Sequence, residues 1–175
     1  MQIRYINQSD SRLAVSNVYE KSWKYAYRGI VSQDYLDDIP TGQWASGIEQ
    51  DGRKNIVLIE NGIIIGTSGF GSARMEDMKG FGEIISLYLL PEYIGKGYGR
   101  QLLQFAMKEL QKMGFHKVYL WVLEENKTAR HFYEKSGFVP TGRCLTCEIG
   151  GRECREIQYE KGGETGDDSE RVGAF

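Results

Sequence analysis

Residues 83–100, EIISLYLLPEYIGKGYGR, contain the change from strand to glycine-rich loop that decides the fold. Residues 83–90 are apolar on both faces and stop at Pro91, which is typical of a central strand covered on both sides. A helix over 99–113 follows, with apolar side chains along one face and a glycine just past its end. The next apolar run, 118–123, is expected to pair in parallel with the first strand, which predicts a βαβ unit.

The glycine-rich loop at residues 95–100, GKGYGR, lies where the strand has ended and the helix begins. Unpaired backbone N–H groups and the positive end of the helix dipole meet there, so an anion such as phosphate is favoured. Lys96 and Arg100 add nearby cations. Two familiar phosphate motifs are excluded, because Arg100 stands where a dinucleotide fingerprint needs glycine and Gly97 stands where a Walker A loop needs Ser or Thr. Taken alone, the loop is either a phosphate site or a flexible surface turn.

The remaining sequence predicts the other strands and helices of a mixed sheet. Asn61 and Gly62 lie between two β-branched runs, which is the strongest short-range signal of a hairpin. Asn126 can cap a helix that buries Phe132 and Tyr133. The further expected elements are a strand over 3–6, a helix over 11–28 capped by Ser9 and Asp10, one or two short helices within 29–51, hairpin strands over 55–60 and 63–70, and a second hairpin over 141–159 around Gly150 and Gly151.

Composition and charge indicate one globular domain and exclude several classes of function. The chain has 175 residues, 41% of them hydrophobic, and a formal net charge of −2. This length suits a single domain, and this charge gives no general attraction to nucleic acid or to an anionic membrane. No apolar run approaches the roughly 20 residues that span a bilayer. Because the N-terminus also lacks the apolar core of a signal peptide, we expect a cytoplasmic protein.

The three cysteines argue against a disulfide framework, because their number is odd and thiols of a cytosolic chain are normally reduced. Cys144 and Cys147 form a Cys-x-x-Cys pattern, but an odd offset directs the side chains of a strand to opposite faces. That geometry is poor for a shared metal ion, so we expect no metal site.

Two motifs, in order along the chain, resemble those of the GNAT superfamily of acyl-CoA N-acyltransferases. The first motif is Gln or Arg, two residues, Gly, one residue, then Gly or Ala; Gly97-Tyr98-Gly99 matches its end, and Ile94 occupies the Gln or Arg position. The second motif is a helix led by Asn that ends in Phe-Tyr-x-x-x-Gly-Phe. It is matched by Asn126, Ala129, Phe132, Tyr133, Gly137 and Phe138. The resemblance covers roughly residues 1–160 and leaves 161–175 as an expected frayed C-terminal tail.

The resemblance implies a fold and a co-substrate. The fold is an α/β (α+β) single domain, in which helices flank a mixed, mostly antiparallel sheet with a central pair of splayed parallel strands. Acetyl-CoA would lie between these strands, with its pantetheine arm on strand backbone groups and its pyrophosphate in the glycine loop. Ile94 loses the side-chain contact of the family's Gln or Arg, which leaves the backbone N–H groups of the loop. The cofactor-binding residues implied are Leu87, Tyr88, Leu89, Ile94, Gly95, Lys96, Gly97, Tyr98, Gly99, Arg100, Asn126 and Tyr133.

The candidates for catalysis are a glutamate, a tyrosine and one backbone N–H group. Glu83 stands 14 positions before Gly97, as a general-base glutamate does in some members of the resembled family. A carboxylate that starts an apolar strand is unusual, although it can be a solvated charge at the strand end. Tyr133 matches the family tyrosine that protonates the leaving thiolate, with a core aromatic as the alternative. The Leu87 N–H would stabilise the oxyanion, whereas Asn126 is equally well explained as an N-cap.

The sequence therefore predicts an N-acetyltransferase that moves an acetyl group from acetyl-CoA to a primary amine by direct attack. A non-catalytic acyl-CoA-binding or sensing module and a protein that binds nucleotide phosphates are the alternatives. The amine acceptor can be a small molecule or a peptide, and a homodimer stays open. The aromatic run Trp23, Tyr25 and Tyr27 lines an acceptor pocket in one interpretation and packs into the core in the other.

Overall fold

The computed structural model describes residues 1–49 and 52–162, which form one mixed sheet with helices on it. The strands, in chain order, are β1 (Gln2–Tyr5), β2 (Lys54–Glu60), β3 (Ile63–Ser72), β4 (Gly82–Leu89), β5 (Lys117–Leu123), β6 (Val139–Ile149) and β7 (Arg152–Gly162). The helices are α1 (Arg12–Ala26), α2 (Gln33–Asp37), η1 (Glu76–Met78), η2 (Pro91–Tyr93), α3 (Tyr98–Lys112) and α4 (Lys127–Lys135). The strand order is β1-β2-β3-β4-β5-β7-β6, and within the described ranges the β4–β5 pair alone is parallel. The predicted fold class is confirmed.

Both hairpins form at the predicted turns. Asn61 and Gly62 join β2 to β3 with φ of 50° and 77°, the left-handed conformations that a two-residue type I′ turn requires. β6 and β7 pair on either side of Gly150 and Gly151. β7 continues to Gly162, and residues 163–175 of the expected tail lie outside the described residues.

The N-cap of α1 is Ser11, and the expectation that Ser9 and Asp10 cap this helix is wrong. The Ser11 hydroxyl accepts a hydrogen bond from the Ala14 N–H at 3.2 Å. The Asp10 carboxylate is engaged elsewhere, because Arg4 donates to both of its oxygens at 2.7 Å. This bidentate ion pair ties the end of β1 to the start of α1, so the cap passes to the next residue.

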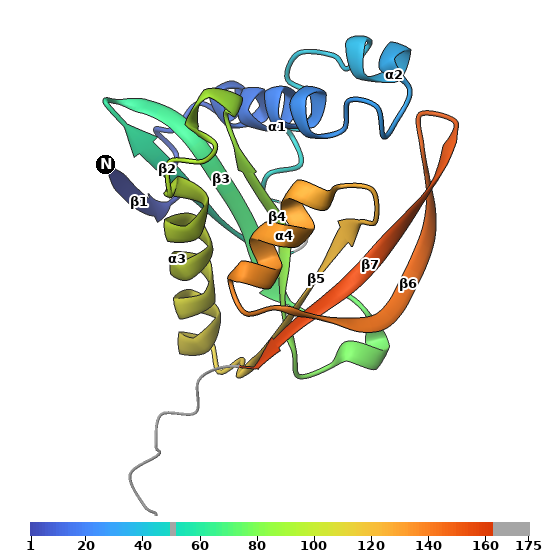
Figure 1. Ribbon diagram of the computed structural model, residues 1–175. Coiled ribbons are helices and arrows are strands. Elements are labelled where there is room, and N and C mark those ends of the chain that lie inside the picture. Colours follow the sequence, from blue (N-terminus) through green and yellow to red (C-terminus); the bar gives the residue numbers. More distant parts are fainter. Residues whose placement is uncertain (50–51, 163–175) are drawn as a thin grey trace, which may run out of the picture.

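The helices cover both faces of the sheet. Tyr88 of β4 accepts a hydrogen bond from Trp23 of α1 at 3.1 Å. The next residue, Leu89, points the other way and packs on Gly99 of α3, where an added Cβ would lie 3.4 Å from it. We therefore distinguish the α1 face from the α3 face of the sheet. Figure 1 shows α3 and α4 together on one face and the β6–β7 hairpin reaching toward α2. None of the helices within 1–49 and 52–162 is long and apolar enough to cross a membrane.

The parallel strands β4 and β5 pair over a short distance only. Their register contains two pairs, Gly82 with Val118 and Glu83 with Tyr119. Beyond these pairs each strand continues beside its other neighbour, β4 beside β3 and β5 beside β7. Figure 1 shows the two strands diverging, with α4 in front of the space between them. A gap between β4 and β5 therefore opens along the carboxyl-terminal half of β4.

A β-bulge at Ile85 decides which side chains of β4 share a face. The register with β3 skips this residue, so β4 carries one residue more than its partner there. Glu83 and Ser86 are three positions apart and would lie on opposite faces of a regular strand. Because the bulge shifts the alternation by one, both lie on the α1 face, where Ser86 Oγ is 3.0 Å from the Tyr19 hydroxyl.

The paired end of β4 and β5 is held from the α3 face by a buried leucine. Leu110 of α3 is fully buried in the main core cluster. Its Cδ2 lies 3.0 Å from the position of a Cβ added to Gly82, so the side chain packs directly on the backbone of the first paired residue. Glycine at this position allows the helix to approach the sheet, and the leucine fills the space.

Truncating this leucine is expected to destabilise the whole domain. Leu110→Ala should lower the free energy of unfolding by roughly 2–5 kcal/mol, because it removes a buried side chain and leaves a cavity. Leu13→Ala in α1 is the matched control, since Leu13 is 61% exposed, and it should cost less than about 0.5 kcal/mol. Urea unfolding followed by circular dichroism measures both. Equal losses in the two variants would contradict the packing of Leu110 on Gly82.

Candidate active site

The glycine-rich loop forms the N-terminus of α3, as predicted. Gly97 is the N-cap with φ of 86°, and Gly95 has φ of 80°, a region that glycine adopts without steric cost. No side chain caps this end of the helix, so the N–H groups of its first turn remain for a ligand. Arg100 lies on that turn, and Lys96 Nζ lies 5.4 Å from the centre of the Tyr93 ring. The geometry is that of an anion-binding helix N-terminus.

The other predicted loop residues surround the same turn. Tyr98 packs on Tyr93 with ring centres 5.8 Å apart. A Cβ at Gly99 would lie 3.5 Å from Phe132 of α4, so glycine here allows α3 and α4 to approach closely. Ile94 ends η2, and its N–H donates to the Pro91 carbonyl at 3.1 Å. The N–H of Ile94 is therefore occupied, and the availability of the N–H groups of residues 95–100 for a ligand stays a prediction.

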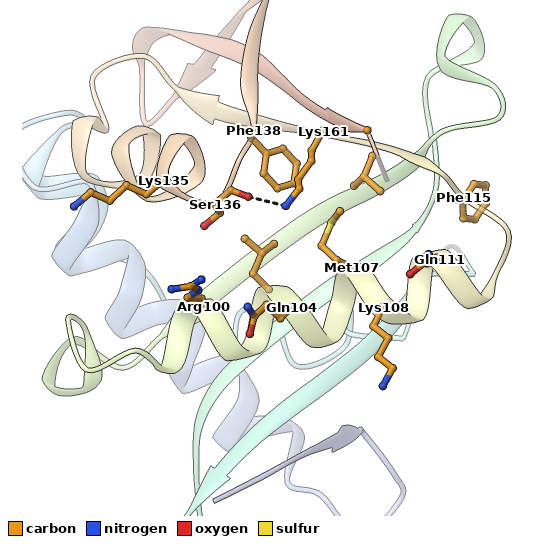
Figure 2. Close-up of a pocket in the computed structure, with 13 residues that line it drawn as sticks. Arg100, Gln104, Met107, Lys108, Gln111, Phe115, Lys135, Ser136, Phe138 and Lys161 are labelled. Atoms are coloured by element: carbon orange, nitrogen blue, oxygen red, sulfur yellow. Dashed lines mark hydrogen bonds between the residues drawn. The ribbon is translucent and has the colours of Figure 1, made fainter. Parts of the chain in front are cut away.

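A groove along α3 begins at this loop, and the end of α4 together with β5 and β7 forms its other wall (Figure 2). It encloses about 360 Å³, and the described residues that line it include four cationic side chains and no carboxylate. The four are Arg100, Lys108, Lys135 and Lys161. Figure 2 shows Arg100 and Lys135 at the same end of the groove, on facing helices, and Lys108 directed away from it. Lys161 Nζ donates to the Ser136 carbonyl at 2.8 Å, so the end near the glycine loop is the one suited to an added anion.

Three predicted backbone contacts and one helix cap lie along the gap between β4 and β5. Leu87, Tyr88 and Leu89 all follow Glu83, the last residue of β4 that pairs with β5. The edge of β4 that faces β5 therefore has no strand partner at these residues. Asn126 Oδ1 accepts a hydrogen bond from a backbone N–H three residues on, at 3.1 Å. Its role as the N-cap of α4 is confirmed, and its role toward a cofactor stays a prediction.

Tyr133 of α4 reaches the gap from the α3 face. Its ring lies 5.1 Å from Phe132 and 5.8 Å from Phe138, and the residue is 9% exposed. Burial raises the pKa of Tyr133, and the nearby Tyr88 hydroxyl raises it further. Tyr88 lies on the α1 face and packs against the core cluster that contains Tyr133, so the two side chains come near each other from opposite faces of the sheet.

Glu83 is a buried carboxylate held by Arg74, and the interpretation as a solvated charge at a strand end is wrong. The residue is 2% exposed. Arg74 donates to it from its backbone N–H at 3.1 Å and from Nη2 at 2.7 Å, and the Tyr119 hydroxyl donates at 2.9 Å. Burial acts to raise the pKa of Glu83, but the hydrogen bonds and charge of Arg74 outweigh it and keep the pKa below its ordinary value. Burial and the bond to Glu83 raise the pKa of Tyr119 to about 12.

Aromatic side chains of α1 cover the gap from the α1 face. The rings of Trp23 and Tyr27 lie 4.7 Å apart, and the rings of Tyr19 and Tyr88 lie 4.6 Å apart. Tyr25 is 54% exposed and lies on the outer side of the helix. Of the predicted aromatic run, Trp23 and Tyr27 therefore belong to this surface and Tyr25 does not.

The motifs and the fold agree with one known family. The model of the Acetyltransferase (GNAT) family matches residues 15–138 of this chain. The chain belongs to this family. It is an N-acetyltransferase, and the match includes the glycine loop of α3 and the helix α4 described above.

Named GNAT relatives cover most of the chain. The spermidine N(1)-acetyltransferase of Thermoplasma acidophilum is 27% identical over 142 residues, which cover 79% of this chain and 88% of that protein. The L-amino acid N-acyltransferase MnaT of Escherichia coli is 28% identical over 145 residues, which cover 82% of each protein. The crystal structure of the PaiA N-acetyltransferase from Thermoplasma acidophilum in complex with coenzyme A has a TM-score of 0.71 at 24% identity and covers 93% of this chain and 99% of that chain. This likeness confirms the fold.

One carboxylate of this GNAT domain was not predicted. Glu156 of β7 lies opposite Leu123 of β5 and is half-buried on the α1 face. Burial raises the pKa of Glu156, and the charge of Arg74 only partly offsets that shift. The sequence alone does not distinguish this half-buried glutamate from the exposed glutamates of the same strand, such as Glu153.

The lowered pKa of Glu83 predicts how stability depends on pH. A carboxyl group with a lower pKa in the folded state adds stability above its unfolded pKa, and this stability is lost as the pH falls through the folded pKa. Glu83→Gln should lower the free energy of unfolding by roughly 1–3 kcal/mol at neutral pH, because charged hydrogen bonds to Arg74 are lost. The variant should then lose less stability than the wild type between about pH 5 and pH 3. Urea unfolding at several pH values measures both effects.

The matched control for this experiment is Glu153→Gln, since Glu153 is an exposed glutamate. It should follow the wild type at every pH. Parallel losses of stability in the wild type and in Glu83→Gln would mean that the ion pair of Glu83 with Arg74 does not form in solution.

Proposed function

We propose that this GNAT domain transfers an acetyl group from acetyl-CoA to a primary amine by direct attack, with no covalent enzyme intermediate. The observation that carries the proposal is the gap between β4 and β5. It opens beside the glycine loop of α3, and it allows Tyr133 from one face to approach Tyr88 from the other. An amine acceptor agrees with the names of the two relatives, which refer to spermidine and to L-amino acids.

The residues around the gap fit acetyl-CoA. The unpaired edge of β4 at residues 87–89 offers backbone groups to the amides of the pantetheine arm. The first turn of α3 offers N–H groups to the pyrophosphate. Arg100 and Lys135 stand where further phosphate charge can be neutralised. Ile94 contributes neither a polar side chain nor a free N–H, so phosphate binding is left to Gly95 and the residues after it.

The side chains along the gap can perform the proton transfers of the reaction. Acetyl-CoA supplies the thioester carbonyl that the amine attacks and the thiolate that leaves. The Leu87 N–H is the proposed donor to the oxyanion. Tyr133 is the proposed acid toward the sulfur, and its raised pKa keeps the hydroxyl protonated at neutral pH. An ammonium group cannot attack, so a carboxylate on the α1 face must accept its proton; the sequence hypothesis assigns this step to Glu83, through water.

The first test is whether CoA binds at the glycine loop. Excess CoA should raise the melting temperature of the wild type, since a ligand at 100 times its Kd stabilises by about 2.7 kcal/mol. Gly97→Glu should abolish most of this rise, because it places a side chain and a negative charge at the N-cap of α3. Differential scanning fluorimetry with and without CoA measures the rise.

Gly80→Glu is the matched control for the loop variant. Gly80 has φ of 91° and no atom within 4 Å of an added Cβ, and Gly97 has φ of 86° with the same free space. Both variants therefore carry similar backbone strain and the same added charge. An equal CoA-dependent rise in the two variants would remove the phosphate role from the loop.

The second test concerns Tyr133 as the acid toward the leaving thiolate. Tyr133→Phe should keep the fold and the CoA-dependent rise in Tm, because it removes one hydroxyl group and keeps the ring. It should lower kcat by roughly 10²–10⁴-fold, the usual contribution of a general acid. Thiol release with a saturating amine measures kcat.

Tyr25→Phe is the control, since Tyr25 is 54% exposed on the outer side of α1. It should keep the wild-type rate. A wild-type kcat for Tyr133→Phe would leave that tyrosine with a packing role only. CoA binding without thiol release in the wild type, over a broad panel of amines, would favour a non-catalytic acyl-CoA-binding module instead.

A further inference from the structure

Glu156 is a half-buried carboxylate at the centre of a three-strand surface. It lies opposite Leu123 of β5 on one side and opposite Leu145 of β6 on the other. Directly opposed residues share a face of the sheet. Leu123 belongs to the apolar cluster under α2 that also includes Trp23 and Tyr27. Glu156 therefore faces the α1 side, at the edge of an aromatic and aliphatic surface.

The Glu156 carboxylate has no hydrogen-bond donor and no ion-pair partner among residues 1–49 and 52–162. Four titratable groups are close enough to Glu156 for their charges to interact with it. They are Arg74 from the segment between β3 and β4, Tyr27 from the end of α1, Cys147 from β6 and Cys154 from β7. Arg74 is the one cation of this set, and it is already bound to Glu83. A half-buried carboxylate in this position can still accept a hydrogen bond or an ion pair from a ligand.

A second polar side chain on the same face has one atom without a partner. Gln158 lies two residues along β7 from Glu156 and is 1% exposed. Its Oε1 accepts a hydrogen bond from the Thr141 hydroxyl at 3.0 Å, but its Nε2 has no acceptor in the part of the chain that the structure describes. Buried polar atoms are nearly always paired, so this amide nitrogen is an exception on the face that carries Glu156.

Tyrosine hydroxyls connect Glu156 with the proposed reaction centre. Tyr27 is near enough to Glu156, and also to Tyr133, for their charges to act on its hydroxyl. Tyr27 and Tyr88 interact directly, and Tyr88 in turn is close to Tyr133. Burial raises the pKa of Tyr27 and of Tyr88, so both hydroxyls stay protonated. Glu156 thus lies on the α1 face of β7, one strand beyond the gap that Tyr133 enters from the α3 face.

We propose that Glu156 binds the ammonium group of the acceptor amine and accepts its proton before attack, while Trp23 and Tyr27 form the apolar wall beside it. This inference rests on the proposed acetyl transfer and names the class of acceptor, a primary amine that arrives as a cation. Aromatic rings favour a cationic substrate, because a cation is attracted to the face of Trp or Tyr.

The protons balance with these residues in place. The ammonium group gives its first proton to the Glu156 carboxylate, and the nitrogen lone pair that is freed forms the new bond to the acetyl carbon. The carbon–sulfur bond then breaks and its electron pair leaves with sulfur. Tyr133 gives its proton to that sulfur and is restored by the second proton of the nitrogen. Glu156 returns the first proton to solvent.

Glu156 suits this task better than Glu83. Both are carboxylates on the α1 face, but Glu83 already accepts hydrogen bonds from Arg74 and Tyr119. The lowered pKa of Glu83 makes it a weak proton acceptor near neutral pH. The pKa of Glu156 is raised and is therefore closer to neutral pH, which favours proton transfer. We therefore assign Glu83 to positioning, through its ion pair with Arg74 beside the gap.

The test compares Glu156→Gln with Glu153→Gln, the same substitution at an exposed position of β7. Spermidine, L-methionine and a tripeptide that begins with alanine are the probes, and kinetics are measured with the amine that the wild type acetylates fastest. Glu156→Gln should lower kcat/KM by roughly 10²–10⁴-fold at neutral pH. The deficit should shrink toward about pH 9.5, where the amine loses its proton without help. The CoA-dependent rise in Tm should be unchanged, which shows that the variant is folded.

A second readout does not depend on turnover. The carboxyl carbon of Glu156 is followed by NMR in protein labelled at glutamate, with the signal assigned by its absence from Glu156→Gln. Its pKa should lie above the ordinary value for glutamate in the CoA complex and should fall when the acceptor amine is added, because a nearby cation favours the carboxylate. In Glu153→Gln the same signal should titrate as in the wild type.

The outcomes separate the inference from the proposed function. No thiol release by the wild type with any of the three amines, while CoA still raises Tm, overturns the proposed function and the inference with it. Wild-type turnover with equal kinetics in Glu156→Gln and Glu153→Gln overturns the inference alone. A pH-dependent deficit in Glu83→Gln that is absent from Glu156→Gln also overturns the inference alone. If Glu156→Gln changes only KM, and does so at every pH, the proposed proton transfer to Glu156 is overturned.

Discussion

The arrangement of this domain depends on where the pairing of β4 with β5 stops. Every backbone N–H and C=O buried in a sheet needs a partner, so two neighbouring strands can part only where something else satisfies them. Here β3 pairs along β4 and β7 pairs along β5, which satisfies the outer edge of each strand but not the edges that face the gap. The sheet therefore stays continuous through two residue pairs, and one edge of β4 remains for a ligand. The helices on either face then supply side chains to one common opening.

The bulge at Ile85 is the second constraint on this opening. It turns the side chain of Glu83 to the face that also carries Ser86 and Tyr88, and it does so with one residue that has no counterpart in β3. Simple alternation along residues 83–90 would instead group Glu83 with Leu87. A bulge depends on the neighbouring strand as much as on the sequence that contains it, and for that reason the pattern of apolar residues did not predict it.

The sequence predicted the features that local chemistry determines. A turn such as Asn61–Gly62 has one favourable conformation, and Asn126 caps a helix through a contact three residues away, so both follow from short segments. The environment of Glu83 did not follow, because its partner Arg74 lies in the irregular segment between β3 and β4. Glu156 was missed because its partial burial comes from pairing with β5 on one side and β6 on the other, which the glutamates of its own strand do not reveal.

The two carboxylates of the α1 face show how one environment can separate the roles of two identical groups. Burial acts on both and raises the pKa of each, but Arg74 binds Glu83 directly and reverses the shift there. A carboxylate that already accepts several hydrogen bonds must give one up before it takes a proton, and that loss raises the cost of the transfer. Glu156 has no such bond to lose among the described residues, so in the proposed complex the ammonium group of the substrate supplies its hydrogen bonds. Proton transfer at the gap is therefore expected where the carboxylate is least satisfied, while the fully bonded carboxylate holds the strand end and the arginine in place.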